Sequence, residues 1–244
     1  NQIFWMEWHF LLPAIKSIKL LDQKIVACTK CPRLVEWREE VAVVKRKAYE
    51  NEKYWGKPVP GFGPDNARIV IVGLAPGAHG ANRTGRIFTG DSSGDWLYKA
   101  LHKNGLATIP TSTSANDGQK LIDTRITCAV RCAPPDNKPS TEEKSQCSDY
   151  LINEIELLMP TARTFVALGS FAWSAIIKSL RALDNQIPTP TPKFGHGESF
   201  TYVGADGVKR LVLGSYHPSQ QNTFTGKLTE PMLNSVFKKA KSFK

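Results

Sequence analysis

Four short apolar runs, with helical patterns between them, limit the fold of this chain more than any other feature. Each run is rich in Val, Ile, Leu and Ala, and together they occupy residues 68–73, 124–130, 164–169 and 210–214. Continuous apolar character over so few residues is typical of strands that are buried on both faces. The alternation of strands and helices predicts an α/β fold, a three-layer αβα sandwich around a central parallel sheet of roughly four strands.

Helical patterns fill the intervals between these runs. Helices are expected over residues 95–103, 140–158, 170–180 and 229–239. Ser140 and Glu143 have the spacing of a capping box, which marks the start of the second helix. Residues 205–207, Ala-Asp-Gly, predict a hairpin turn, and the Pro- and Gly-rich residues 183–199 predict a surface loop. Neither a repeat nor a second domain is visible, so residues 1–244 are expected to form one domain with a helical N-terminal extension.

The charge of the chain bears on its partner. The 32 Lys and Arg outnumber the 22 Asp and Glu, which gives a net charge of +10 and a pI of about 9.4. Such a balance favours a polyanionic partner, nucleic acid above all, although a basic surface can also serve solubility alone.

The sequence also bears on location. No run of 18 apolar residues occurs, so no membrane span is expected. The apolar and aromatic residues 3–12 lack the basic start and cleavage site of a secretory signal, and we expect them to form a short extension packed on the domain. Five cysteines, an odd number, without an export signal favour reduced thiols and a cytoplasmic location.

Four of the cysteines form two pairs, Cys28 with Cys31 and Cys132 with Cys147. A Cys-x-x-Cys pair alone is found in redox disulfides, zinc knuckles and iron–sulfur sites. Two further sulfurs far along the chain favour a structural metal clamp. The wide second pair, one member at a strand end and the other in a helix, favours a [4Fe–4S] cluster over zinc. Cys128 lies in a predicted buried strand, and we expect it to be a small hydrophobic residue rather than a ligand.

Several motifs resemble those of a known family when they are taken in order. They are Cys28-x-x-Cys31, Gly-Leu-Ala-Pro-Gly at 73–77, His-Gly-x-Asn-Arg-Thr-Gly-Arg-x-Phe-Thr-Gly-Asp at 79–91, Arg-Cys-Ala-Pro-Pro-Asp-Asn-Lys-Pro at 131–139, and His-Pro-Ser at 217–219. The set resembles the iron–sulfur uracil-DNA glycosylases, and its details favour the type-B branch, family 5. The resemblance implies an αβα fold, a structural [4Fe–4S] cluster, and a monomer that excises deaminated bases from DNA.

Two positions depart from the better-known family 4 pattern. Leu74 stands where that branch has an acidic residue, and Cys128 stands where it has a uracil-reading Asn. Type-B enzymes usually have Ala at the second position, so Cys128 departs from that pattern as well. A thiol cannot match the pyrimidine edge as an amide does. The resemblance therefore implies a pocket of broader specificity, which accepts uracil, hypoxanthine and xanthine.

The resemblance also implies roles for individual residues. His217 is expected to stabilise the departing base anion, and Asp91 to orient water or stabilise the cationic sugar, with capping of the next helix as the alternative. Asn137 is expected to hold water or substrate. Phe88 is expected to stack on the flipped base, unless it only packs in the core.

The remaining expected contacts divide between base and DNA backbone. The other residues expected to bind the base are Gly73, Ala75, Gly77, Asn82 and Cys128. The loop at 219–228 is expected to enter the duplex, with Phe224 as a wedge and Ser219, Gln220, Gln221 and Asn222 in contact with DNA. The expected phosphate contacts are Arg83, Arg86, Lys227 and the Lys238–Lys239 pair.

Two other functions remain open from the sequence. A non-catalytic iron–sulfur nucleic-acid-binding module explains the charge and the cysteines but leaves the His217 motif without a role. A zinc-stabilised nuclease or nucleotide hydrolase requires clustered carboxylates, and the strand ends offer only Asp91 and Asp95.

Overall fold

The computed structural model describes residues 15–244. The first of its helices are α1 (Ile18–Val26) and α2 (Pro32–Val44). The expected packing of residues 3–12 lies outside the described residues. No helix in the described part of the chain has the length and apolar character needed to cross a membrane.

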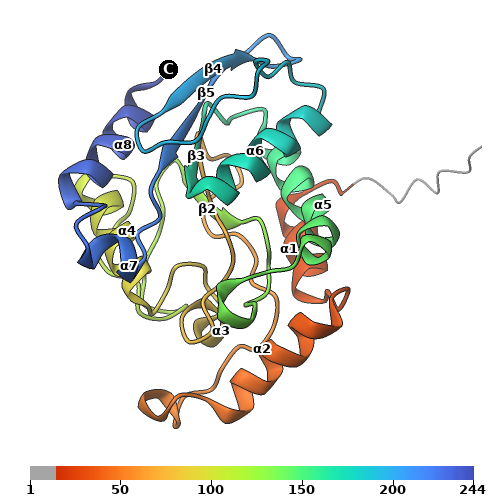
Figure 1. Cartoon of the computed structure of the whole chain (residues 1–244), viewed down its shortest axis with the longest axis vertical. Coiled ribbons are helices and arrows are strands. Elements are labelled where there is room, and N and C mark those ends of the chain that lie inside the picture. Colours follow the sequence, from red (N-terminus) through yellow and green to blue (C-terminus); the bar gives the residue numbers. More distant parts are fainter. Residues whose placement is uncertain (1–14) are drawn as a thin grey trace, which may run out of the picture.

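A five-stranded sheet forms the centre of the molecule (Figure 1). Its strands are β1 (Ile69–Gly73), β2 (Thr124–Cys128), β3 (Thr164–Leu168), β4 (Ser199–Val203) and β5 (Lys209–Ser215), in the order β2-β1-β3-β5-β4. The four predicted strands pair in parallel, whereas β4 pairs antiparallel with β5. The predicted hairpin turn at 205–207 thus joins two strands of one sheet, and the sheet gains a fifth strand at its edge.

Alternate residues of each parallel strand face opposite layers of helices, as the side-chain period of two requires. Ile69 and Ile71 belong to the hydrophobic cluster that contains α4 (Ser92–Lys103) and α8 (Glu230–Ser242). Val70 and Val72 belong to the cluster formed with α5 (Thr141–Leu158) and α6 (Ser170–Ala182). The predicted αβα sandwich is therefore confirmed.

The helix starts follow local capping chemistry. The predicted capping box is present at α5, where Glu143 N donates to Ser140 Oγ and Ser140 N donates to Glu143 Oε2. α4 begins at Ser92, three residues before the predicted start, because the Asp91 carboxylate accepts a hydrogen bond from Gly94 N. Four shorter elements complete the fold: α3 (Ala81–Thr84), α7 (Gln220–Phe224), and single 3₁₀ turns at Lys47–Tyr49 and Pro135–Asn137.

One buried carboxylate joins α1, β2 and α5. Glu154 Oε1 lies 2.6 Å from Arg125 Nε, and Glu154 Oε2 lies 2.5 Å from Arg131 Nη2 and 2.7 Å from Thr127 Oγ1. Arg125 also pairs with Asp22 of α1 at 3.1 Å. Burial alone would raise the pKa of Glu154, but the two guanidinium groups lower it to about 2. The side chain is therefore ionised, and its charge is compensated within the protein.

We expect Glu154→Gln to lower the free energy of unfolding by about 3 kcal/mol or more, because it leaves two buried guanidinium groups without their shared counter-ion. Urea denaturation measures the loss. Glu156→Gln, an exposed change on the same helix, is the matched control and should stay within about 0.5 kcal/mol of the wild type. Equal stability of the two variants would show that the network is dispensable.

Candidate active site

A pocket of about 430 Å³ opens at the carboxyl ends of the parallel strands. This edge of an open α/β sheet is where ligands usually bind, because the loops that leave neighbouring strands converge there. The pocket draws on five segments: the turn after β1, the loop that precedes α4, the start of α4, the 3₁₀ turn at 135–137, and the segment after β5. Its lining residues are Leu74, Ala75, Gly77, Ile87, Phe88, Asp91, Ser93, Asp136, Asn137, His217, Ser219 and Gln221.

His217 follows β5 directly and brings its imidazole ring to the pocket wall. Its backbone oxygen accepts a hydrogen bond of 2.9 Å from Asn222 Nδ2 of α7, which fixes the turn after the strand. The surrounding protein excludes water from much of the ring, and this burial lowers the pKa of His217 to about 4. At neutral pH the ring is therefore uncharged, with one nitrogen as a donor and the other as an acceptor.

Phe88 stands against His217, with 5.6 Å between the two ring centroids. On its other side the ring covers the end of β1, where a Cβ on Gly73 would come within 2.9 Å of it. Phe88, Asp136 and Asn137 all have φ between +51° and +56°, a conformation that side-chain-bearing residues rarely adopt. Strained residues of this kind cluster at functional sites. The pocket thus combines an aromatic surface with loops held in unfavourable conformations.

Asp91 performs the capping role and also lines the pocket. Asp91 Oδ1 accepts from Gly94 N at 2.9 Å and so caps α4. The other oxygen lies against the glycine-rich turn, where a Cβ on Gly80 would collide with it and one on Gly77 would lie 3.1 Å away. Burial raises the pKa of Asp91. The two roles that the sequence left as alternatives are compatible, because each uses a different oxygen.

Three residues expected to touch the base stand apart from the pocket lining. Gly73 and Cys128 are register partners at the ends of β1 and β2 and lie behind Phe88. Cys128 is buried, and desolvation raises its pKa to about 12, as expected for an inert thiol. Asn82 is also buried, and its Nδ2 donates to Arg38 O at 3.1 Å. The structure therefore places these residues in the support of the pocket.

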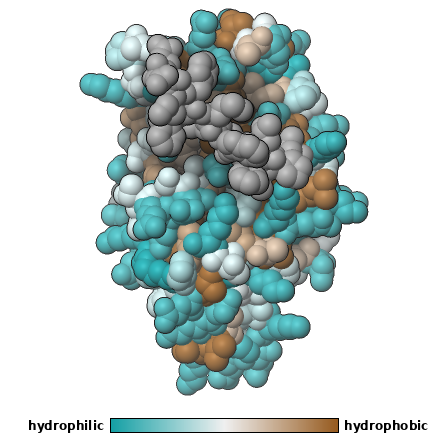
Figure 2. All heavy atoms as spheres, turned by 90° about the vertical axis from the view of Figure 1, so that its right-hand side faces the viewer, coloured by the Kyte–Doolittle hydropathy of each residue, from teal (hydrophilic) through white to brown (hydrophobic). Residues whose placement is uncertain are grey.

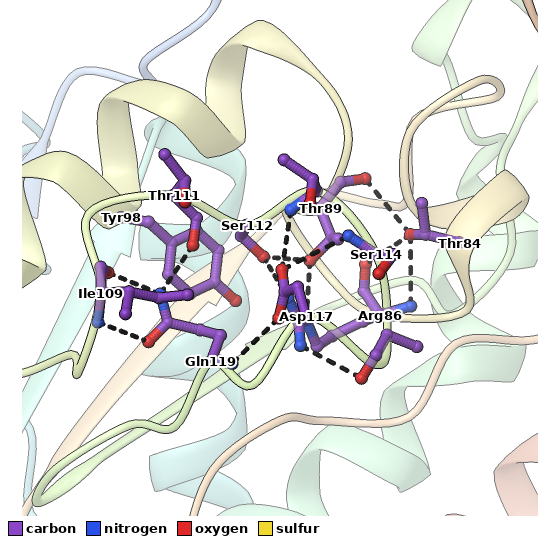
Figure 3. Close-up of polar contacts among 12 residues, drawn as sticks. Thr84, Arg86, Thr89, Tyr98, Ile109, Thr111, Ser112, Ser114, Asp117 and Gln119 are labelled. Carbon is purple, nitrogen blue, oxygen red and sulfur yellow. Dashed lines mark hydrogen bonds and ion pairs between the residues drawn. The ribbon is translucent and has the colours of Figure 1, made fainter.

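Arg86 was expected to contact phosphate, and the structure places it inside the protein instead. Its guanidinium binds Asp117 Oδ2 at 2.6 Å, Ser112 Oγ at 2.7 Å and Thr89 Oγ1 at 3.0 Å (Figure 3). Only 5% of the side chain is exposed. The charge is neutralised and its donors are occupied, so Arg86 serves to hold the loop that precedes α4.

Arg83 requires the same correction. Its guanidinium donates to His79 O at 2.7 Å, to Gly90 O at 2.9 Å and to Glu52 Oε2 at 2.5 Å. It also stacks on the Tyr49 ring at 3.8 Å. A residue with all of these partners is a structural support, and phosphate cannot replace them without unfolding the loop.

The segment expected to enter the duplex contains the five-residue helix α7. Ser219 caps it, and Ser219 and Gln221 reach the pocket. Gln220 is exposed, while Asn222 is engaged with His217 O. Phe224, expected as a wedge, is 79% exposed. Lys227 lies over the Tyr216 ring, 4.9 Å from its centroid, and remains on the surface.

The four paired cysteines, Cys28, Cys31, Cys132 and Cys147, line a single small pocket. They arrive there from the end of α1, the start of α2, the loop after β2 and the middle of α5. Within residues 15–244, no group of three or more His, Cys, Asp or Glu is arranged to hold a metal ion as it stands. The structure thus brings the four predicted sulfurs to one place without forming a single-ion site.

Two hydrogen-bond donors point at sulfur atoms of this cysteine pocket. Arg38 Nη1 lies 3.1 Å from Cys132 Sγ, and Arg131 N lies 3.3 Å from Cys147 Sγ. Leu34 and Val130 supply apolar walls. Sequence reasoning missed Arg38, because nothing in its local pattern separates it from the other charged residues of α2. Sequence reasoning also missed Ile87, Ser93 and Asp136 in the lining of the larger pocket. The only signal that could have found them is their position within or next to the motifs at 79–91 and 131–139.

Comparisons with known proteins identify the family of the chain. The sequence model of the uracil DNA glycosylase superfamily matches residues 60–241. A protein named Type-5 uracil-DNA glycosylase from Mycobacterium tuberculosis (strain CDC 1551 / Oshkosh) is 53% identical over 225 residues, 92% of this chain and 81% of that protein. A Type-5 uracil-DNA glycosylase from Thermus thermophilus is 47% identical over 220 residues, 90% of this chain and 94% of its own.

The more distant branch matches less well. A protein named Type-4 uracil-DNA glycosylase from Pyrobaculum aerophilum is 30% identical over 225 residues, 91% of this chain and 90% of that protein. The predicted choice between the two branches is therefore confirmed. The chain belongs to the uracil-DNA glycosylase superfamily and, within it, to the type-5 family.

Proposed function

We propose that this protein is a DNA glycosylase, which flips a deaminated nucleotide out of the duplex and cleaves its N-glycosidic bond to leave an abasic site. The observation that carries the proposal is the convergence of His217, Phe88, Asp91 and Asn137 on one pocket. Its volume of about 430 Å³ suits a ligand of nucleotide size. An enzyme that acts on a base must extrude it from the stack and grip it by stacking and hydrogen bonds.

His217 acts on the leaving base. As the glycosidic bond stretches, its electron pair moves to the base, which departs as an anion. The neutral imidazole donates an N–H hydrogen bond to a base oxygen and stabilises this charge in a site where water is sparse. One preorganised donor of this kind contributes about 3 kcal/mol to the transition state. The lowered pKa of His217 supports this role, because a donor that needs no proton from solvent works throughout the neutral range.

Asp91 acts on the sugar. The stretched sugar carries oxocarbenium-like positive charge, which the carboxylate stabilises while it orients the attacking water. Asn137, which lines the same pocket, positions the same water. Leu74 lines the pocket but has no polar atom in its side chain, and we assign the carboxylate to Asp91, at the start of α4.

The range of bases is assigned from the stacking surface of Phe88, which accepts purines as well as pyrimidines. Cys128 lies behind that ring, so position 128 places no amide in the pocket that would select a pyrimidine edge. We therefore assign uracil, hypoxanthine and xanthine in DNA as substrates, with a water molecule as the only co-reactant. The reaction is a single hydrolysis, without strand cleavage.

The direct test incubates the protein with duplexes that carry one uracil, hypoxanthine or xanthine, and cleaves abasic sites with alkali. We expect all three to be converted. His217→Ala should reduce every rate by about 10²–10³, because it removes support for the leaving anion common to the three bases. A wild-type protein that binds these duplexes but releases no base would instead support a non-catalytic nucleic-acid-binding module.

The variant Asp91→Asn tests the proposed catalytic role of Asp91 separately from its role as the cap of α4. Asn caps helices as well as Asp does, so the free energy of unfolding should change by less than about 0.5 kcal/mol. The loss of the carboxylate should lower the rate of base release about a hundredfold or more in single-turnover assays. Asp95→Asn, in the first turn of the same helix but outside the pocket, is the control and should retain the wild-type rate. Equal rates for the two variants would remove Asp91 from the mechanism.

A structural [4Fe–4S] cluster, held by Cys28, Cys31, Cys132 and Cys147, is part of the proposal. The shared pocket of the four sulfurs supports it, as do the Arg38 and Arg131 donors directed at two of them. Donors of this kind favour the thiolate form that ligates iron. Such a cluster would cross-link α1, α2, the loop after β2, and α5, and would take no part in the reaction.

Cys132→Ser should abolish the binding of about four iron atoms per chain and lower solubility. Cys128→Ala, a change of the fifth cysteine, is the matched control and should keep the full iron content. Iron and sulfide analysis of anaerobically purified protein measures both. Full iron in Cys132→Ser would overturn the ligand assignment without affecting the glycosylase assignment.

A further inference from the structure

The burial of Arg83 and Arg86 removes two of the predicted phosphate contacts and leaves Lys227 and the Lys238–Lys239 pair, which are exposed. The segment that precedes β1 offers a further source of positive charge for the DNA backbone. Residues 45–57, which we call the basic arm, contain five basic side chains, Lys45, Arg46, Lys47, Lys53 and Lys57, against two acidic ones.

The basic side chains of the arm are available to solvent. Arg46, Lys47, Lys53 and Lys57 are exposed, and Lys45 is half-buried. Of the two acidic residues, Glu52 is paired with Arg83, so its charge is already compensated. The free charge of the arm is therefore strongly positive, which favours a polyanion.

The backbone of the arm is bound to the loops around the pocket. Trp55 N donates to Arg83 O at 2.9 Å, and Gly56 N donates to Asn82 O at 3.0 Å. The Tyr54 hydroxyl lies 3.0 Å from His79 Nδ1. The arm thus has a fixed position relative to the 79–91 motif.

Arg83 completes this attachment. Through Glu52 and Tyr49 it holds the arm, and through Gly90 O it holds the residue next to Asp91. This side chain therefore connects the arm to the pocket, in addition to the hydrogen bonds of Tyr54, Trp55 and Gly56. Phosphate contacts set the register of a protein on the duplex.

The arm also lies at the appropriate end of the molecule. In Figure 1 the end of α2 and the turn that follows it extend below α3, on the side of the sheet where the loops of the pocket lie. Figure 2, turned about the same vertical axis, shows a mainly hydrophilic surface at this lower end, with a few hydrophobic residues among the polar ones. Val43 and Val44, both exposed, are the last residues of α2.

We propose that the basic arm is a DNA-backbone-binding surface that positions the duplex over the pocket, and that Arg83 is the residue that holds it there. The proposal rests on the proposed function for the identity of the polyanion. It assigns the phosphate contacts to Arg46, Lys47 and Lys53, which are exposed, form no ion pair within the described residues, and approach DNA without any loss of internal contacts.

The test measures binding of a short undamaged duplex by fluorescence anisotropy between about 50 and 200 mM NaCl. The combined variant Arg46→Gln, Lys47→Gln, Lys53→Gln should reduce the slope of log K against log salt by about 2–3, because each lost phosphate contact removes about 0.9. The affinity at the lowest salt should fall roughly tenfold or more. Circular dichroism and thermal unfolding should match the wild type.

A matched variant removes equal charge from the other end of the sheet. Lys120 and Lys209 precede or begin strands, and Lys178 lies near the end of α6, so all three exposed residues are distant from the pocket. Their change to Gln should leave the salt slope within about 1 of the wild type. An unchanged slope in the arm variant, or an equal fall in both variants, would overturn the proposal.

The outcome is separable from that of the proposed function. Base release by the wild-type protein decides whether it is a glycosylase, whereas the salt slope on undamaged DNA decides whether the arm binds the backbone. A wild-type protein that releases uracil, combined with an arm variant that keeps its slope, would refute the arm alone. If the wild-type protein releases no base but the arm variant has a smaller salt slope, the glycosylase proposal would be refuted. The proposal that the basic arm binds the DNA backbone would stand.

Discussion

The ion pairs of Glu154 connect α5 with β2 and the loop that follows it, and through Arg125 with α1. The arrangement of the rest of the structure depends on these connections. This carboxylate lies on α5, seven residues after Cys147, and binds both Arg125 of β2 and Arg131, the neighbour of Cys132. Arg125 in turn reaches Asp22 on α1, the helix that leads to Cys28. The three segments that carry these cysteines are thus aligned by one buried charge network. The network thus holds three of the four segments whose cysteines line the small pocket.

The pocket depends on a second set of supports at the carboxyl edge of the sheet. Gly73 allows the Phe88 ring to lie directly on the end of β1, and Gly80 leaves room for the Asp91 carboxylate. Arg83 and Arg86 hold the loop that carries Phe88 and leads to Asp91. Arg83 donates to Gly90 O within this loop, and Arg86 donates to Ser112 Oγ outside it. Most of the 79–91 motif therefore builds the pocket rather than lining it.

Much of the fold followed from the sequence because its causes are local. The parallel strands are apolar on both faces, and Ser140 with Glu143 marks a helix start by its own hydrogen bonds. Arg83 and Arg86 were assigned wrongly, because a charged residue does not reveal by its pattern which distant carboxylate it will meet. Glu52 and Asp117 each lie about 30 residues away from their partner. The short helix α7 was missed because its five residues, Gln-Gln-Asn-Thr-Phe, are too few to show an apolar period.

The double attachment of Asp91 has a consequence for how such a pocket can vary. One oxygen is fixed to the first turn of α4, so this wall moves only if a twelve-residue helix moves with it. The short turn that carries Asn137 and the five-residue helix α7 also border the pocket, and neither contributes a buried residue to the core. Differences in size between bases are therefore absorbed more easily by these short segments than by α4. Asn137 is assigned to the proposed reaction, so we expect sequence change that alters the fit without disturbing the chemistry at Gln221, on α7.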